Sequence, residues 1–294
     1  MPIRDQQKVR MGAAAGRFFE GDPLTLRRRM AEVEGGFVPE TPLGAVKGAV
    51  LPHAGYVFSL ATAMKTLAPA RKMKFRRAIL LGPSHYVGFH GVALSSFSRW
   101  RTPFGDLSTD TDLADQVEAW NDPLIQLDDK PHLQEHSLEV EFPLLQYFFE
   151  NPPVLPMVVG SLTFPEVVRL GRKLGELDTP ETLWIISSDF THYGRNFHYT
   201  PFTKQIPEKL RELDLGAAKF AASRDLPGFA NYLGRTGATI CGALPIALFL
   251  AMLEATDPEG KIIGRIIDRS DSGEVTGDYS HVVDYVGILY ESRS

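Results

Sequence analysis

The sequence predicts an α/β fold in which a central, mixed but largely parallel β-sheet is flanked by helices. Runs of β-branched or continuously apolar residues alternate with helix-like segments along the chain. Such alternation is typical of a sheet that helices cover on both faces. Prolines and glycines, 21 and 26 of 294 residues, are scattered and do not collect at one boundary. We therefore expect residues 1–294 to form a single domain.

The predicted strands are short and rich in Val, Ile and Leu: Val46–Leu51, Ala78–Leu81, Val92–Leu94, Val154–Val159, Leu183–Ser187, Ile262–Ile267 and Val282–Leu289. The predicted helices lie between them: Leu24–Val33, Ser59–Leu67, Asp112–Trp120, Leu138–Phe149, Pro165–Leu174, Glu208–Ala222 and Leu244–Leu253. Thr109 or Asp110 supplies an N-cap for the third of these helices. The polar, glycine-bearing stretch Asp268–Asp278 is expected to be a surface loop or a lid over a cleft.

The composition of the chain limits which partners and which cellular compartment we expect. The net charge of −5 argues against nucleic acid as a partner, because proteins that bind phosphate backbones usually carry a basic balance. A single cysteine cannot form an internal disulfide. The longest apolar run, Cys241–Leu253, contains Gly242 and Pro245 and is too short to span a bilayer. We therefore expect a cytoplasmic protein without a membrane partner.

Titratable residues follow three of the predicted strands at the points where these strands end. His53 follows the first strand, His85 follows the second, and Asp189 and His192 follow the fifth. In an open α/β sheet, ligands bind in the crevice outside the carboxyl ends of the strands. We therefore expect these side chains to face one another across one cleft.

His53 and His85 occupy matching positions after two strands, which favours a metal site. One such histidine alone is more often a structural hydrogen-bonder, but neutral imidazole is the commonest protein metal ligand. Cys241 is the best third candidate, since it lies just ahead of a predicted helix whose dipole would favour the thiolate. The other interpretation of Cys241, a small buried hydrophobe, stays open at this point.

Further polar residues have roles that the sequence leaves open. Asp189 and His192 stand three apart and would share one face of a helical first turn, as a carboxylate ligand and a general base or as a helix cap. Glu135 and His136 open a predicted helix, and we expect them, with Ser188, to orient the ligands from outside the metal's own shell. The remaining histidines are expected to be structural or at the surface: His90, His132, His198 and His281.

Five ordered sequence blocks together resemble the Memo family, and the resemblance runs from about Arg10 to Tyr290. The blocks are Pro52-His53-Ala54-Gly55-Tyr56, Leu81-Gly82-Pro83-Ser84-His85, Glu135-His136-Ser137-Leu138-Glu139, Ser187-Ser188-Asp189-Phe190-Thr191-His192-Tyr193-Gly194 and Ile240-Cys241-Gly242. Two positions depart from the family pattern: Ala243 stands where many members have Arg, and Phe19 stands where a Tyr is frequent.

The resemblance implies a fold similar to the class III extradiol (LigB-type) non-haem iron dioxygenases. It also implies metal ligation by His53, His85 and Cys241, with Asp189 and His192 beside them as catalytic groups. Extradiol enzymes use two histidines and a carboxylate for Fe(II), whereas Cys241 takes the third position here. The expected metal is therefore iron or copper, with zinc as a further candidate.

Three functions are compatible with these residues. The first is a metal-dependent, dioxygenase-like redox enzyme in which His192 acts as acid or base. The second is a non-catalytic binding or scaffold module that keeps the cleft for a small-molecule or peptide ligand, with a radical-SAM protein as a partner implied by family association. The third is a hydrolase in which His192 activates Cys241 or Ser188. The absence of a Gly-x-Ser-x-Gly elbow around Ser188 disfavours the third.

Overall fold

The computed structural model describes residues 8–293 and confirms the predicted α/β architecture, a mixed sheet flanked by helices. Within that range a nine-stranded sheet has the order β10-β12-β2-β9-β3-β8-β4-β7, and β11 pairs with β12. The pairs of β9 with β2 and of β3 with β9 and β8 are parallel. The pairs of β12 with β2, β10 and β11 are antiparallel. A second, three-stranded sheet has the order β1-β5-β6.

The strands have the following bounds: β1 (Val9–Arg10), β2 (Val46–Leu51), β3 (Arg77–Pro83), β4 (Val92–Leu94), β5 (Arg99–Thr102), β6 (Gly105–Ser108), β7 (Ile125–Leu127), β8 (Val154–Val159), β9 (Thr182–Ser187), β10 (His192–Gly194), β11 (Ile262–Asp271) and β12 (His281–Ser292). The α-helices have the following bounds: α1 (Pro23–Gly35), α2 (Tyr56–Leu67), α3 (Thr111–Ala119), α4 (Lys130–Leu133), α5 (Glu141–Phe148), α6 (Phe164–Leu174), α7 (Ile206–Ala222), α8 (Leu226–Thr236), α9 (Ala243–Thr256) and α10 (Ser272–Thr276).

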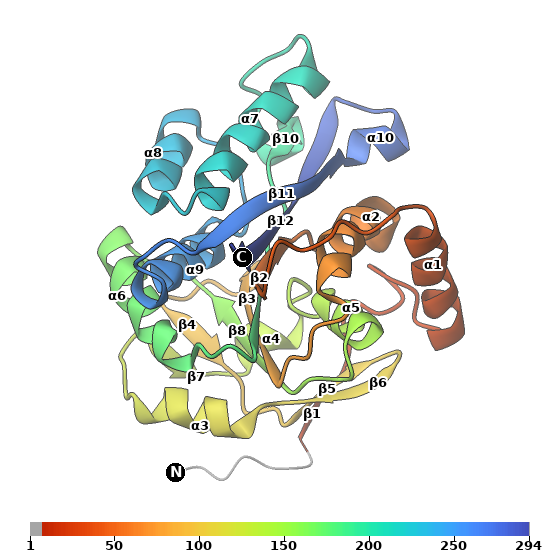
Figure 1. Ribbon diagram of the computed structural model, residues 1–294. Helices are drawn as coiled ribbons and strands as arrows, with labels where there is room; N and C mark the ends of the chain where they lie inside the picture. The colour runs from red at the N-terminus through yellow and green to blue at the C-terminus, as the bar shows by residue number, and fades with distance from the viewer. Residues whose placement is uncertain (1–7, 294) are drawn as a thin grey trace.

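The central strands are apolar on both faces because helices cover the sheet on both sides. In β9, Leu183 and Ile185 belong to one buried cluster, and Trp184 and Ile186 belong to the other. Alternate residues of a strand point to opposite faces, so a strand covered twice needs a continuous apolar run. Figure 1 shows α6 and α9 on one side of the sheet and α1 and α2 on the other. The near-continuous apolar sequence of the predicted strands is thereby explained.

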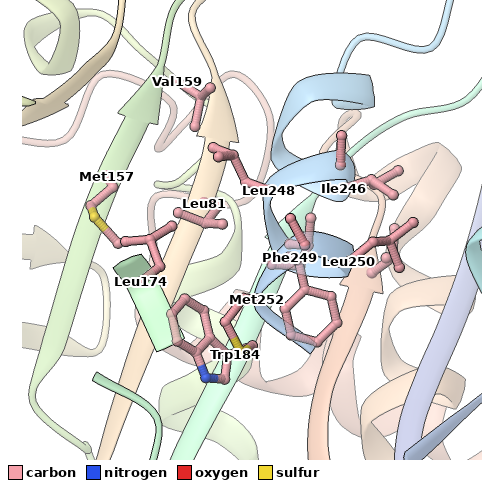
Figure 2. Packing of buried hydrophobic residues seen from close by; sticks show 14 of the residues in the cluster. Leu81, Met157, Val159, Leu174, Trp184, Ile246, Leu248, Phe249, Leu250 and Met252 are labelled. Carbon is pink, nitrogen blue, oxygen red and sulfur yellow. The ribbon is translucent and has the colours of Figure 1, made fainter. Parts of the chain in front are cut away.

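Helix α9 is the most deeply buried helix element of the core. Nine of its residues, from Pro245 to Leu253, are buried, so it has no polar face. Figure 2 shows Phe249 and Met252 of α9 beside Trp184 of the sheet. A Cβ atom on Gly171 of α6 would stand 2.4 Å from the Cβ of Ala251, so this glycine permits the close approach of α6 to α9. The burial of α9 places its N-terminus, and with it Cys241, at a defined point of the sheet edge.

The register of three parallel strands brings the predicted site loops to one edge of the sheet. Strands β2 and β3 flank β9, with Leu51 opposite Ser187 and Leu81 opposite Ile186. The three strands therefore end within one or two residues of the same level. The segments that begin at Pro52, Ser84 and Ser188 leave the sheet side by side, as the strand-end argument predicted.

Two local predictions are wrong. The stretch Asp268–Asp278 is not a loop, because its first residues continue β11 and the next ones form α10. Asp189 and His192 do not share a helical turn. The chain from His192 to Gly194 is extended as β10, since it pairs with β12 in antiparallel fashion.

Other differences concern element bounds and short elements. Helix α5 begins at Glu141, three residues later than predicted, after a turn. Asp110 is the N-cap of α3, since its side chain accepts a hydrogen bond from Leu113 N. Helix α8 and the short strands of the second sheet were not predicted. A helix that opens on Leu-Pro-Gly carries poor helix formers, and two- to four-residue strands are too short to show a period. Among the described helices, none combines the length and apolarity needed to cross a bilayer.

We expect Phe249→Ala to destabilise the protein by about 3–5 kcal/mol, because it leaves a cavity against Trp184 in the core. The matched control is Phe164→Ala, since Phe164 is 46% exposed, and its cost should stay within about 0.5 kcal/mol. Urea unfolding followed by circular dichroism measures both free energies. Equal losses in the two variants would contradict the packing described for α9.

Candidate metal centre

Three histidines from different segments meet at the carboxyl edge of the sheet. His53 follows β2, His85 follows β3 and His136 precedes α5. Each contributes one imidazole nitrogen, and the three nitrogens all lie within 4.8 Å of one another. The ring centroids are 5.2 Å apart for His53 and His85, 5.4 Å for His53 and His136, and 4.6 Å for His85 and His136. Three nitrogens at this spacing can hold one metal ion.

The ring of His53 is oriented by Ser187, the last residue of β9. Ser187 Oγ donates to the carbonyl of Ser137 at 2.6 Å, and His53 Nδ1 lies 2.8 Å from the same Oγ. With its hydrogen used in this way, the Ser187 oxygen accepts from His53 Nδ1–H. The lone pair of His53 then lies on Nε2, which is the tautomer that a ligating histidine needs.

Glu135 orients the other two histidines from a buried position. Its carboxylate accepts a hydrogen bond from His85 Nδ1 at 2.8 Å and from His85 N at 2.6 Å. It also accepts from the backbone N–H groups of His136 and Ser137, each at 3.0 Å. Burial acts to raise the pKa of Glu135, but the hydrogen bonds and charge of His85 oppose it, and the pKa falls to about 2. A carboxylate that holds the Nδ1 of a histidine leaves Nε2 free for a metal.

The electrostatics of the cluster keep its buried imidazoles neutral. Burial lowers the pKa of His53 well below its usual range, and the neighbouring His85 lowers it further. Burial, together with His53 and His85, lowers the pKa of His136 to about 3. Neutral imidazole is the form that binds metal ions, so no proton has to leave these two residues before a metal enters. The donor set and its protonation state therefore fit a transition metal.

Cys241 lies next to His53, just before the first residue of α9. Its Sγ is 3.3 Å from His53 Nε2 and donates to the carbonyl of Asp189 at 3.5 Å. Gly242 must be a glycine here, since a Cβ would stand 2.3 Å from the Cβ of Ser188. Burial raises the pKa of the Cys241 thiol well above its usual range, and the charge of Asp189 raises it further. Burial therefore opposes the thiolate form that the helix dipole was expected to favour.

Asp189 and His192 lie close to His53, in the segment that leads into β10. Asp189 Oδ1 accepts from the backbone N–H groups of His53 at 2.8 Å and Ala54 at 3.2 Å, so it holds the turn that carries His53. Burial raises the pKa of Asp189, and the charge of His192 opposes that rise. His192 Nδ1 lies 3.0 Å from the carbonyl of Phe190 and 3.1 Å from that of Thr239, so in the neutral ring Nδ1 carries the hydrogen and Nε2 the lone pair.

Ser188 joins the Asp189 segment to the start of α9. Its hydroxyl donates to the Asp189 carbonyl at 2.9 Å and accepts from Gly242 N at 3.2 Å. Cys241, the other candidate nucleophile, lies against His53 and not against His192. In the described part of the chain neither candidate makes a hydrogen bond with His192, so the hydrolase interpretation has no nucleophile–base pair.

Some residues of the site were not singled out from the sequence. Ser187 was placed only as the end of a strand, although the run Ser187-Ser188-Asp189 at a strand end is a usable signal. Phe18 stacks on His136 with a centroid distance of 4.3 Å, and Tyr86 lies 5.8 Å from the same ring. Phe18 and Tyr86 lie 50 or more residues from His136 along the chain, so no local sequence pattern indicates these two contacts. His136, expected outside the metal's own shell, supplies the third nitrogen of the cluster.

Comparison with known proteins identifies relatives along almost the whole chain. The family model described as Memo-like protein matches residues 10–289. A MEMO1 family protein of Methanosarcina barkeri is 32% identical over 287 residues, which cover 96% of this chain and 100% of the relative. The protein memo-1 homolog of Caenorhabditis elegans is 28% identical over 255 residues, which cover 84% of this chain and 72% of the relative. The relatives from Methanosarcina barkeri and Caenorhabditis elegans are thus each similar to this chain over at least 84% of its length.

A solved structure of another protein shares this fold. The crystal structure of an uncharacterized protein from Escherichia coli K12 superposes with a TM-score of 0.53 and covers 82% of this chain and 99% of that chain. Its sequence identity is 15%, so the likeness concerns the arrangement of the elements alone.

We expect His136→Gln to flatten the pH dependence of stability in the metal-free protein. An unfolded histidine takes up a proton below about pH 6.5, whereas folded His136 does so only near its pKa of about 3. In between, the unfolded state binds more protons, so stability falls as the pH falls, by about 1.4 kcal/mol per pH unit for each such histidine. Urea unfolding between about pH 5 and pH 7 measures the slope. The exposed His90, changed to Gln, is the control, and equal slopes in wild type and His136→Gln would contradict the assignment.

Proposed function

This chain belongs to the Memo family, and from that premise we propose that it holds a redox-active metal, iron or copper, and oxidises a small organic substrate. The observation that carries the proposal is the cluster of three imidazole nitrogens within 4.8 Å of one another. Imidazole suits iron, copper, zinc and nickel, and a sulfur donor beside it favours the softer ions among these. The Cys241 sulfur, 3.3 Å from His53 Nε2, is such a neighbour.

The polar groups around the cluster match what a metal site requires beyond its ligands. Histidine ligands need a partner on the opposite ring nitrogen, and here Ser187 serves His53 while Glu135 serves His85. The Glu135 carboxylate adds a negative charge beside the three rings, which favours a bound cation. A divalent ion would also stabilise the thiolate of Cys241 and so reverse the effect of burial on that group.

The chain also supplies a proton acceptor beside the centre. A bound iron or copper ion would exchange single electrons with dioxygen. His192 donates through Nδ1 to backbone carbonyls, so its Nε2 is free to take a proton from a substrate hydroxyl. Asp189 holds the backbone of the His53 turn and thereby fixes the distance between the acceptor and the cluster. The residues thus divide into donors, orienting groups and one acid–base group.

We expect protein purified without added metal, or loaded with Fe(II) or Cu(I) under anaerobic conditions, to carry about one metal ion per chain. His53→Ala and His85→Ala should each lose it, since each removes a donor from a three-nitrogen set. Comparing His136→Ala with Cys241→Ser decides which of the two supplies the third donor. Elemental analysis measures the occupancy, and circular dichroism checks the fold.

His90→Ala is the matched control, because His90 is an exposed histidine paired with Glu166 outside the cluster. Its metal content should equal that of wild type. Full occupancy in the double variant His53→Ala/His85→Ala would overturn the site. Occupancy by zinc alone, or by iron or copper without dioxygen consumption on phenols and catechols, would contradict the redox function and favour a binding module.

We expect Glu135→Gln to weaken metal binding about 10–100-fold while leaving the fold intact, because the amide carries no charge and orients His85 less firmly. Competition with a chromophoric chelator measures the affinity. The control is Glu166→Gln, since Glu166 holds His90 at the surface in the same residue pairing. A loss of the same size in both variants would show that the effect does not come from the site.

A further inference from the structure

We propose that the cavity beside Cys241 is the binding site for an uncharged, mainly apolar organic molecule that bears a hydroxyl group. The inference deepens the proposed function by naming the class of its substrate, and it rests on that function only for the chemistry at the metal. The cavity has a volume of about 490 Å³. Pockets for small molecules usually fall between about 300 and 1,000 Å³.

The cavity lies at the carboxyl ends of β3 and β8, with the start of α9 as its opposite wall. Pro83 and Val159, the last residues of the two strands, line it, and so do Leu244 and Pro245 of α9. Binding at this edge is the general rule for open α/β sheets. Cys241 is part of the wall and is also the residue whose sulfur lies 3.3 Å from His53 Nε2. A molecule in the cavity therefore lies next to the candidate metal centre on its sulfur side.

The chemistry of the wall selects against charged ligands. None of the described residues that line the cavity has an acidic or basic side chain. The apolar part of the wall includes Val87, Phe89 and Leu244. A carboxylate or an ammonium group placed there would lose part of its water without gaining an oppositely charged side chain, which is unfavourable. An aromatic or aliphatic body loses nothing comparable and gains the burial of its surface.

Two serine hydroxyl groups in the wall determine whether a ligand can donate or accept a hydrogen bond there. Ser84 Oγ donates to the carbonyl of Val87 at 2.7 Å, and Ser161 Oγ donates to the carbonyl of Phe89 at 3.1 Å. Each serine hydrogen is thus donated to a backbone carbonyl, and what remains for a ligand is an acceptor lone pair. His90 Nδ1 also lies 3.3 Å from Ser161 Oγ and, because His90 Nε2 donates to Glu166, it competes for the Ser161 hydrogen. Ser84 Oγ has a single partner for its hydrogen and is therefore the better-defined acceptor. A ligand hydroxyl can donate to it.

The test uses 2-naphthol as the probe and 2-naphthoate as its charged counterpart, with the metal-free full-length protein near neutral pH. Calorimetry or equilibrium dialysis measures both dissociation constants. We expect 2-naphthol to bind about tenfold or more tightly than 2-naphthoate. Absence of 2-naphthol binding, or equal or tighter binding of 2-naphthoate, would overturn the proposal. Because no metal is present, this result is independent of the metal-occupancy measurements.

Substitutions in the cavity wall test whether 2-naphthol binds in this cavity. Gly88 lines the cavity, and a Cβ at this position meets no atom within 4 Å, so Gly88→Leu adds bulk without a clash. Leu244→Glu places a carboxylate against the apolar wall. Each should weaken 2-naphthol binding about tenfold. The matched control is Gly234→Leu, another glycine with open space, in α8. Folded Gly88→Leu and Leu244→Glu proteins that both bind 2-naphthol like wild type would rule out this cavity.

Discussion

The hydrogen-bonded register of β2, β9 and β3 is the constraint on which the rest of the site depends. Leu51 lies opposite Ser187 and Leu81 opposite Ile186, so three chain segments leave the sheet at one level. A shift of one residue in either pair would turn alternate side chains to the other face of the sheet. The two buried clusters, one on each face, oppose such a shift, because each strand is apolar on both sides but fits only one arrangement.

Most of the buried polar groups at this edge hydrogen-bond one another. Ser187 links His53 to Ser137, and Glu135 links His85 to the backbone before α5. Glu141 is buried beside Ser187, and burial raises its pKa well above the usual range, which favours its neutral form. A connected network of this kind holds each ring in one orientation, which is what metal ligation needs. It also keeps neutral histidines in the interior, where they cost stability in acid.

The same edge combines two environments that differ in polarity. On one side of Cys241 stand three imidazoles and the Glu135 carboxylate, and on the other side is a cavity without charged walls. A cation and an apolar molecule would therefore occupy adjacent positions without competing for the same groups. This division between a polar centre and an apolar pocket is the usual construction of small-molecule sites, in which few polar groups orient a mostly apolar ligand.

The sequence by itself determined the α/β class and most of the long strands and helices, because hydrophobic periodicity is local. It also placed His53, His85 and Asp189 at strand ends, since the end of an apolar run can be read directly from the order of the residues. The third nitrogen, from His136, and the stacking of Phe18 on it were decided only by tertiary structure. So was the burial that raises the pKa of Cys241, because burial depends on what packs around α9 and not on the neighbouring residues of the chain. Local patterns specify where a side chain leaves the backbone, whereas distances between segments far apart in the chain arise only when the sheet assembles.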